Sequence, residues 1–321
     1  MWITLCDEIS SPDYGRYPGI RSIEELIHNG LLVLDKPPGP TSRECVSWVK
    51  KILGVDKAGH SGTLDPRATG VLPIVLDRAT RVMPALQGLS KRYVTVMRLH
   101  KDIDGEKLKE ICRQFVGKIT QKPPVRSAVR RVKRKREIYS LEVVDIVGRN
   151  AVLDIRCEAG TYIRKLVHQI GEKIGGAHMV ELRRTEVGPY KEEQAHTFQE
   201  LKDTFEFYKN GVGSAEQKLR QILLPVEAAV EHIPKLIIKD SAVFSICNGS
   251  PLYIGGICKF EDSIKKDGLV AMITGKGELV ALGISNVDWK DIKKSKVPMG
   301  GIIVRTDRVI MEPGIYPKNR K

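Results

Sequence analysis

The sequence predicts an α+β fold, with a central sheet and flanking helices followed by a smaller β-rich domain. Two observations support this fold class. Between residues 22 and 100, apolar runs of strand length alternate with segments of helical spacing. From residue 236 onwards, short apolar runs are separated by glycine turns such as Gly275-Lys276-Gly277, a pattern typical of a small β-barrel. The 321 residues are enough for two domains of ordinary size.

The chain divides into three parts. Residues 1–21 are polar and rich in proline and glycine, which predicts an extended arm rather than a core element. Residues 22–235 form the main domain, and residues 236–321 form the β-rich domain.

Two capping boxes mark helix starts in the main domain. Ser22 with Glu25 opens a short helix that Gly30 ends. Thr41 with Glu44 opens a second helix, which Gly54 closes. Residues 31–34 and 71–76 are expected to be strands, and the proline-rich segment 35–42 between the first strand and the second helix is expected to be a rigid turn.

The later elements follow from periodicity. Residues 92–100 alternate as a strand that carries Tyr93 on a partly apolar face. The other expected elements are a helix at 104–116, a hairpin of strands 139–147 and 151–158, a helix beginning at Tyr162 and capped by Gly160-Thr161, a strand within 178–190 and a helical linker at 191–235.

Charge indicates a polyanionic partner. The net charge is +14, which favours RNA or DNA. An anionic membrane is the competing partner, but we see no long apolar run, signal peptide or lipidation motif to support it. The six cysteines form no C-x-x-C pair, so we expect no zinc site or other metal, reduced thiols and a cytoplasmic protein.

One segment is strongly basic. Eight of the fifteen residues at 122–136 are Lys or Arg, and none is acidic. A solvated loop is the plain interpretation, and a clamp on RNA phosphates is the functional one. The RNA-binding candidates are Arg126, Arg130, Arg131, Lys133, Arg134, Lys135 and Arg136.

The loop at residues 59–70 is the main candidate for chemistry. Its three glycines and Pro66 predict an irregular turn that is neither helix nor strand. Pro66 also keeps Asp65 out of the helical region, so the carboxylate is suited to point into a cleft. A glycine-rich loop with a capping aspartate is the structural alternative. The loop lacks the Lys-Ser/Thr ending of a P-loop.

This loop, Gly59-His60-Ser61-Gly62-Thr63-Leu64-Asp65-Pro66-Arg67-Ala68-Thr69-Gly70, resembles the G-H-x-G-T-L-D-P-x-A-T-G signature of the TruB/dyskerin family of RNA pseudouridine synthases. The resemblance implies the pseudouridine synthase fold, which has a mixed, mainly antiparallel central sheet with flanking helices. It also implies that Asp65 is the catalytic residue.

Other motifs resemble the same family, and three of their residues have a structural alternative. Lys36, in a D-K-P-x-G-x-T-S turn, either holds RNA phosphate or braces the site, and its short reach favours bracing. The resemblance implies that Tyr93 stacks on a flipped base; a half-buried strand tyrosine is the alternative. In the G-T-Y-I-R motif, Arg164 would pair with Asp65 and keep that carboxylate ionised, and Tyr162 would line the pocket; a surface helix charge is the alternative for Arg164. Leu182, in L-R-R-T, would pack on the target uracil.

The implied reaction is the isomerisation of uridine. The N1–C1′ bond breaks, the base turns, and C5 bonds to C1′, so no cofactor is required. The base must leave its stack, and His60 either fills the resulting gap or makes a structural hydrogen bond.

Two features favour the dyskerin-type, guided subgroup in its archaeal form. The run Met97-Arg98-Leu99-His100-Lys101-Asp102 resembles the guided form, and the arm with the β-rich domain, which resembles a PUA RNA-binding module, suits it too. This implies an H/ACA guide RNA, small protein partners of that ribonucleoprotein and ribosomal RNA as substrate. The arm would pack on the PUA domain, and the basic segment would be a thumb loop that orders on RNA. Stand-alone action on the tRNA T-loop, a non-catalytic RNA-binding scaffold and a hydrolase using Asp65 are the alternatives.

Overall fold

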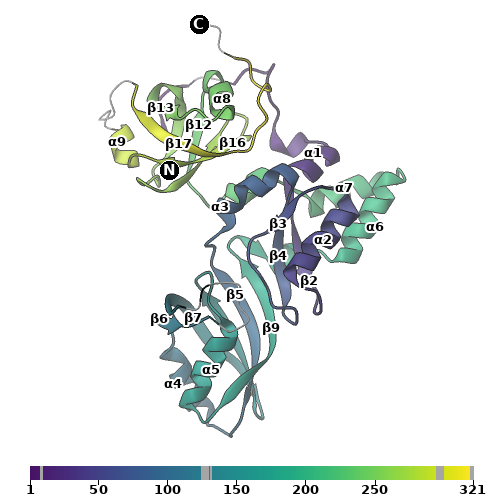
Figure 1. Ribbon diagram of the computed structural model, residues 1–321, viewed down its shortest axis with the longest axis vertical. Coiled ribbons are helices and arrows are strands. Elements are labelled where there is room, and N and C mark those ends of the chain that lie inside the picture. The colour runs from purple at the N-terminus through teal and green to yellow at the C-terminus, as the bar shows by residue number, and fades with distance from the viewer. Residues whose placement is uncertain (8–9, 124–129, 131, 294–299, 319–321) are drawn as a thin grey trace.

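The computed structural model describes residues 1–7, 10–123, 130, 132–293 and 300–318. It contains one ten-stranded and one seven-stranded sheet, which lie at opposite ends of an elongated molecule (Figure 1). In the ten-stranded sheet the only parallel neighbours among the described strands are β4 and β9. The sheet is therefore mixed and mainly antiparallel, as predicted.

The ten-stranded sheet has a continuous path of eight strands. Their order is β11 (Leu224–Pro225), β2 (Gly30–Lys36), β4 (Thr69–Leu76), β9 (Ala177–Val187), β5 (Lys91–Leu99), β8 (Asn150–Cys157), β7 (Arg134–Val147) and β6 (Gly117–Gln121). Two short strands lie off this path: β3 (Ala58–His60) pairs with β4, and β10 (Tyr190–Lys191) pairs with β9.

At the β2–β4 end, successive side chains of β2 point to opposite faces of the sheet, and each face packs into a separate core. Leu32 and Leu34 of β2 pack with helices α1 (Ile23–His28), α2 (Ser42–Leu53), α6 (Phe198–Lys209) and α7 (Gly213–Ile222). Leu31 and Val33 face the other way, towards η2 (Asp77–Val82), α3 (Met83–Leu86) and η4 (Val226–Val230). A third core lies at the β5–β8 end, where α4 (Gly105–Arg113) and α5 (Ile163–Lys173) pack on the sheet.

Local capping signals are confirmed. Ser22 and Thr41 both form complete capping boxes, and Gly54 ends α2 in the left-handed conformation with φ of 72°. Gly30 was expected to end α1. The helix instead stops at His28, and Gly30 is the first residue of β2. A Cβ at Gly30 would lie 2.3 Å from the Leu26 carbonyl oxygen, so close packing explains that glycine.

Three other expectations need correction. The loop at 59–70 is irregular only in its middle, because Gly59 and His60 belong to β3 and Thr69 and Gly70 begin β4. The basic segment was expected to lack stable structure, but Arg134 to Arg136 lie in β7, paired with β6. The segment 191–235 is not a mere linker, since β11 returns to pair with β2.

The helix after Gly160 also begins differently. Its first residue is Ile163, and Tyr162 occupies the N-cap position without a capping hydrogen bond from its side chain. Thr161 does not cap the helix, because its hydroxyl donates to the Glu158 carbonyl oxygen.

The smaller sheet includes a strand from each end of the chain. Its order is β1 (Trp2–Thr4), β14 (Ile257–Glu261), β12 (Lys235–Ile238), β15 (Leu269–Ile273), β16 (Leu279–Ser285), β17 (Ile302–Val309) and β13 (Leu252–Tyr253). Helix α8 (Asp240–Cys247) packs on this sheet, with α9 (Trp289–Lys293) nearby. The arm is therefore partly a strand, which the sequence did not predict.

A shared core joins the two halves of the molecule. Leu31 and Val71 of the larger sheet belong to the same buried cluster as Ala271 and Leu282 of the smaller sheet. Arg78 of η2 adds two hydrogen bonds to the Ile310 carbonyl oxygen. The C-terminal domain consequently has a fixed position relative to the larger sheet (Figure 1).

Candidate active site

The loop that carries Asp65 lies between β3 and β4, and the turn after β2 holds it in place. The Ser42 hydroxyl accepts a hydrogen bond from Leu64 N at 2.9 Å and donates to the Leu64 carbonyl oxygen at 3.2 Å. Gly39 N donates to the Pro66 carbonyl oxygen at 2.9 Å. Asp65 thus lies between two residues whose backbones are fixed.

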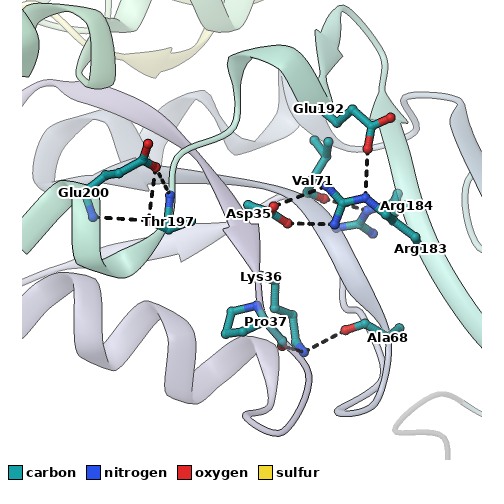
Figure 2. A network of polar contacts seen from close by, with 10 residues as sticks. All are labelled: Asp35, Lys36, Pro37, Ala68, Val71, Arg183, Arg184, Glu192, Thr197 and Glu200. Carbon is teal, nitrogen blue, oxygen red and sulfur yellow. Dashed lines mark hydrogen bonds and ion pairs between the residues drawn. The ribbon is translucent and has the colours of Figure 1, made fainter.

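Lys36 is the central brace of this loop. Its side chain is fully buried, and its Nζ donates to the carbonyl oxygens of Pro37, Pro66 and Ala68 at 2.8 to 2.9 Å. Figure 2 shows Lys36 with Pro37 and Ala68. Burial lowers the pKa of the Lys36 ammonium. All three donors are used within the protein, which is the bracing role rather than a phosphate contact.

Asp65 and Arg164 meet although they are far apart in the sequence. Arg164 Nη2 donates to Asp65 Oδ2 at 2.5 Å, and the two side chains are 61% and 50% exposed. The carboxylate is therefore in contact with water in the free protein. An ion pair this exposed contributes little to stability, so its geometry is better explained by function.

The sheet brings two further predicted residues to the same place. Tyr93 on β5 is 8% exposed and pairs across the strands with Arg184 on β9, while Leu182 lies opposite Thr95. Leu64, Tyr93 and Ile163 belong to one buried cluster, and Leu182 packs against it. This cluster therefore brings together side chains from four parts of the chain: the loop that carries Asp65, β5, β9 and the start of α5.

Arg184 is a residue of this site that sequence reasoning missed. Its side chain is 1% exposed, with Nε donating to the Val71 carbonyl oxygen at 2.8 Å and Nη2 donating to that of Gly62 at 3.2 Å. Burial raises the pKa of Tyr93, and the Arg184 guanidinium opposes that rise. An L-R-R-T motif next to an implied uracil contact was a usable signal, but the motif does not show which arginine points inward.

Arg183 points to the opposite face of β9. Its guanidinium donates to the Asp35 carboxylate at 3.0 and 3.2 Å and to Glu192 Oε2 at 2.8 Å (Figure 2). These bonds tie β9 to the end of β2, next to Lys36.

His60 is at the end of β3 rather than in a turn. Its Nδ1 accepts a hydrogen bond from Gly62 N at 3.3 Å. Burial lowers its pKa, and the charges of Arg184 and Arg43 act in the same direction. The ring is therefore neutral near pH 7, with its proton on Nε2.

Lys91 is a second buried cation near the loop. It is 6% exposed, and its Nζ donates to the Leu89 carbonyl oxygen at 2.6 Å. Burial lowers its pKa to about 8, and the charge of Arg184 contributes to the shift.

The remaining candidates occupy different surroundings. Tyr162 is half-buried at the N-cap of α5, two residues before Arg164. Arg130 and Lys133 are exposed, whereas Arg136 makes an ion pair with Glu158 at 3.3 Å. Arg126 and Arg131 lie outside the described residues, so their role as RNA contacts stays a prediction.

The described residues contain neither a metal-binding cluster nor a membrane-spanning helix. None of them forms a group of three or more His, Cys, Asp or Glu side chains able to hold a metal ion. Within the same residues, no helix is both long and apolar enough to cross a membrane.

Family models cover almost the whole length of the chain. The TruB family pseudouridylate synthase N-terminal domain matches residues 50–163, and the tRNA pseudouridylate synthase B C-terminal domain matches residues 164–231. The chain belongs to the TruB family of pseudouridylate synthases. A PUA domain matches residues 234–310 and a DKCLD domain matches residues 4–46.

Named relatives support the family. The chain is 49% identical over 317 residues to the probable tRNA pseudouridine synthase B of Methanopyrus kandleri, covering 98% of this chain and 92% of the relative. It is 46% identical over 318 residues to the protein of the same name from Methanothermobacter thermautotrophicus, covering 99% and 97%.

Solved structures place it beside the archaeal dyskerin-type proteins. A crystal structure of a Cbf5-Nop10-Gar1 complex has a chain that is 45% identical, with a TM-score of 0.92 over 99% of this chain and 96% of that one. A structure of an H/ACA RNP bound to a substrate RNA containing 2'-deoxyuridine gives 43% identity and a TM-score of 0.91, with 99% and 96% covered. This TruB family member is therefore an RNA pseudouridine synthase, and the pseudouridine synthase fold with a C-terminal PUA domain is confirmed.

Proposed function

We propose that this TruB family enzyme converts uridine to pseudouridine in ribosomal RNA under the direction of an H/ACA guide RNA, with Asp65 as the catalytic carboxylate. The observation that carries the assignment of Asp65 is its pairing with Arg164 from a different element. Support for guidance comes from the similar chains, which were solved in a Cbf5-Nop10-Gar1 complex and in an H/ACA RNP with substrate RNA.

The residues of the site have distinct roles in this reaction. Asp65 is placed to act on the uridine, and the hydrogen bond from Arg164 orients its carboxylate. Tyr93 and Leu182 offer two apolar surfaces for a flipped uracil, and Tyr162 lines the entrance. His60, whose Nδ1 accepts from Gly62 N, is the side chain of this loop that would occupy the gap left by the base.

The free protein leaves this site open to water. Because Asp65 and Arg164 are both at least half exposed, bound RNA has to supply the cover that strengthens their electrostatic interaction. The reaction conserves atoms and electrons, so we expect no cofactor. We also expect the partners to be small H/ACA ribonucleoprotein subunits and the location to be the cytoplasm.

A second candidate function rests on the names of the relatives. Both proteins cited above are called probable tRNA pseudouridine synthase B, which favours direct action on the T-loop of tRNA. Tritium release distinguishes the two, because C5 loses its hydrogen when it bonds to C1′. Release from a 5-tritiated ribosomal RNA fragment only with its complementary guide supports guidance. Guide-independent release from a tRNA transcript alone supports the second candidate.

The catalytic assignment has its own test. Asp65→Asn keeps the size of the side chain but removes the carboxylate, so we expect RNA binding near the wild-type level and loss of tritium release. Asp56→Asn, an exposed aspartate of the turn after α2, is the control and should retain activity. Substantial conversion by the Asp65 variant would refute the assignment.

A further inference from the structure

Gln121, the last residue of β6, contacts the start of helix α5 through its side chain. The side chain is 4% exposed. Its Oε1 accepts a hydrogen bond from Tyr162 N at 2.9 Å, and its Nε2 donates to the Tyr162 carbonyl oxygen at 3.2 Å. One amide therefore satisfies both backbone polar groups of a single residue, and we call this pair of bonds the Gln121 clasp.

The clasp holds the position at which α5 begins. Tyr162 is the N-cap of α5, and its carbonyl oxygen also accepts from Lys165 N and Leu166 N at 3.0 Å. The Tyr162 side chain makes no capping hydrogen bond. Gln121 thus supports the backbone of the N-cap residue itself, and its Oε1 accepts from the N-cap N–H as the Glu or Gln of a capping box does.

Arg164 depends on this support because its own side chain has little packing. It is 61% exposed and ends on Asp65, so its direction follows from where its backbone lies. That backbone is two residues from Tyr162. The neighbouring Ile163 and Leu166 are buried and hold the helix against the core, but apolar packing does not fix the first turn as sharply as two hydrogen bonds do.

A second, weaker connection joins the same two elements. Gln169 in the middle of α5 donates from Nε2 to the Thr120 carbonyl oxygen at 3.1 Å and accepts from Gln121 Nε2 at 3.3 Å. Gln169 bonds β6 from the middle of the helix, so its substitution provides a matched control that alters the β6–α5 contact while leaving both bonds of the clasp in place.

We propose that Gln121 is a positioning residue for the reaction, which sets the aim of Arg164 at Asp65 by holding the backbone of Tyr162. This inference rests on the catalytic assignment of Asp65 and Arg164 proposed above. A carboxylate cannot replace the amide, because its second oxygen would face the Tyr162 carbonyl oxygen with no proton to share. Gln121→Glu removes the donor at nearly constant shape, and Gln121→Met removes both bonds at similar volume.

The test measures single-turnover tritium release and RNA affinity on the RNA that the wild-type enzyme converts, either the guide-paired ribosomal fragment or the tRNA transcript. We expect both Gln121 variants to lose roughly ten- to a hundredfold in rate, the scale for a misplaced catalytic group. Their RNA affinity, and the rate of Gln169→Met, should stay within about twofold of wild type because the clasp acts on chemistry rather than binding.

A double-mutant cycle separates positioning from a general structural role. In an Arg164→Ala background, Gln121→Met should cause no further loss, since the group that it positions is already gone. Any of three outcomes would overturn the proposal. These are rate losses of the two substitutions that multiply in the double variant, a wild-type rate for the Gln121 variants, and Gln121 variants that fail to fold. Wild-type activity in Arg164→Ala and Asp65→Asn would instead refute the catalytic assignment, so the two failures are distinguishable.

Discussion

At the scale of single residues, the main feature is an ion pair that stability does not explain. Asp65 and Arg164 are exposed, lie on different elements and meet at 2.5 Å. By contrast, the buried cations nearby bind backbone carbonyl oxygens: Lys36 holds the loop and Arg184 joins the loop to β4. The site therefore combines an accessible reactive pair with a rigid frame beneath it.

The first prediction concerns the shape of the Arg164 side chain. Arg164→Lys keeps the charge but replaces the planar fork with a point charge, so the carboxylate loses its fixed orientation. We expect at least roughly tenfold slower tritium release in single turnover, with RNA affinity little changed. Arg113→Lys, at an exposed position on α4, should show no loss. Equal rates for both variants would mean that Arg164 does not orient Asp65.

The second prediction uses the buried ammonium of Lys91. Its pKa is about 8 in the folded protein and 10.5 ordinarily, so the unfolded chain binds more protons between these values. The free energy of unfolding should therefore rise with pH from about 8 to 10.5 through this group. Below pH 8 the penalty for burying the charge is fully present.

Urea denaturation of Lys91→Met and of the wild type at several pH values measures this contribution. As the pH rises through this range, the free energy of unfolding of the wild type should increase relative to that of Lys91→Met. Lys107→Met, which alters an exposed lysine of α4, should follow the wild type at every pH. A constant difference between Lys91→Met and wild type would contradict the shifted pKa.

Site residues that stand in a recognisable motif could be predicted from the sequence. Residues whose role depends on a contact made only in the folded protein could not. Asp65, Tyr93, Arg164 and Leu182 stand in patterns that resemble a known family, and the structure brings them together. Arg184 and Gln121 matter through hydrogen bonds to Gly62, Val71 and Tyr162, which only the folded chain brings close. The choice between the two arginines at 183 and 184 depends on strand facing, which the motif does not reveal.

At the scale of elements, the loop of Asp65 is held from β2 and the turn that follows it. Lys36, Gly39 and Ser42 all bond backbone groups of residues 64–68, and the Pro66 carbonyl oxygen accepts from both Lys36 and Gly39. Gly70 closes the loop with φ of 102°, and a Cβ there would lie 2.2 Å from the Arg184 carbonyl oxygen. No side chain is tolerated where the loop enters β4.

The third prediction removes the brace. Lys36→Met leaves the Ala68 carbonyl oxygen without its buried donor, which costs about 1–3 kcal/mol of stability for an unpaired buried group. We also expect slower tritium release with little change in RNA affinity, because the loop that carries Asp65 loosens. Lys51→Met on the exposed face of α2 is the control. A fully active Lys36 variant would show that the loop holds its shape without the brace.

Elements with short-range signals were predicted well. The capping boxes of α1 and α2 and the alternation of β5 depend on neighbours within a few residues. The three-residue β3 and the strand content of the arm were missed because their partners, β4 and β14, lie elsewhere in the chain. Pairing with β6 also overcame the charge repulsion that argued against order at Arg134 to Arg136.

At the scale of the whole molecule, a buried ion pair joins the arm, the catalytic domain and the PUA domain. Arg21 donates from Nη1 and Nη2 to Glu227 at 2.6 and 2.8 Å, and both side chains are largely buried. Glu227 Oε1 also accepts from Leu279 N at the start of β16, 2.8 Å away. One carboxylate therefore connects all three parts.

The fourth prediction removes one partner of this pair. Arg21→Met leaves the Glu227 carboxylate buried without its cation, which should destabilise the protein by about 3–5 kcal/mol. Limited proteolysis should then cleave between the two domains faster than in the wild type. Arg16→Met breaks an exposed pair with Glu25 and should change little. Identical proteolysis of the Arg21 variant and wild type would show that the apolar interface alone fixes the domains.

The pairing of β1 with β14 has a consequence for how the protein is made. Trp2 lies opposite Glu261, so the sheet of the PUA domain is completed by residues that are synthesised long before the other strands of that sheet. Such a distant closure is entropically slow, and the arm must wait near the ribosome until β14 emerges. Until then, or in a fragment that lacks the arm, the backbone edge of β14 is uncovered and available to pair with another molecule.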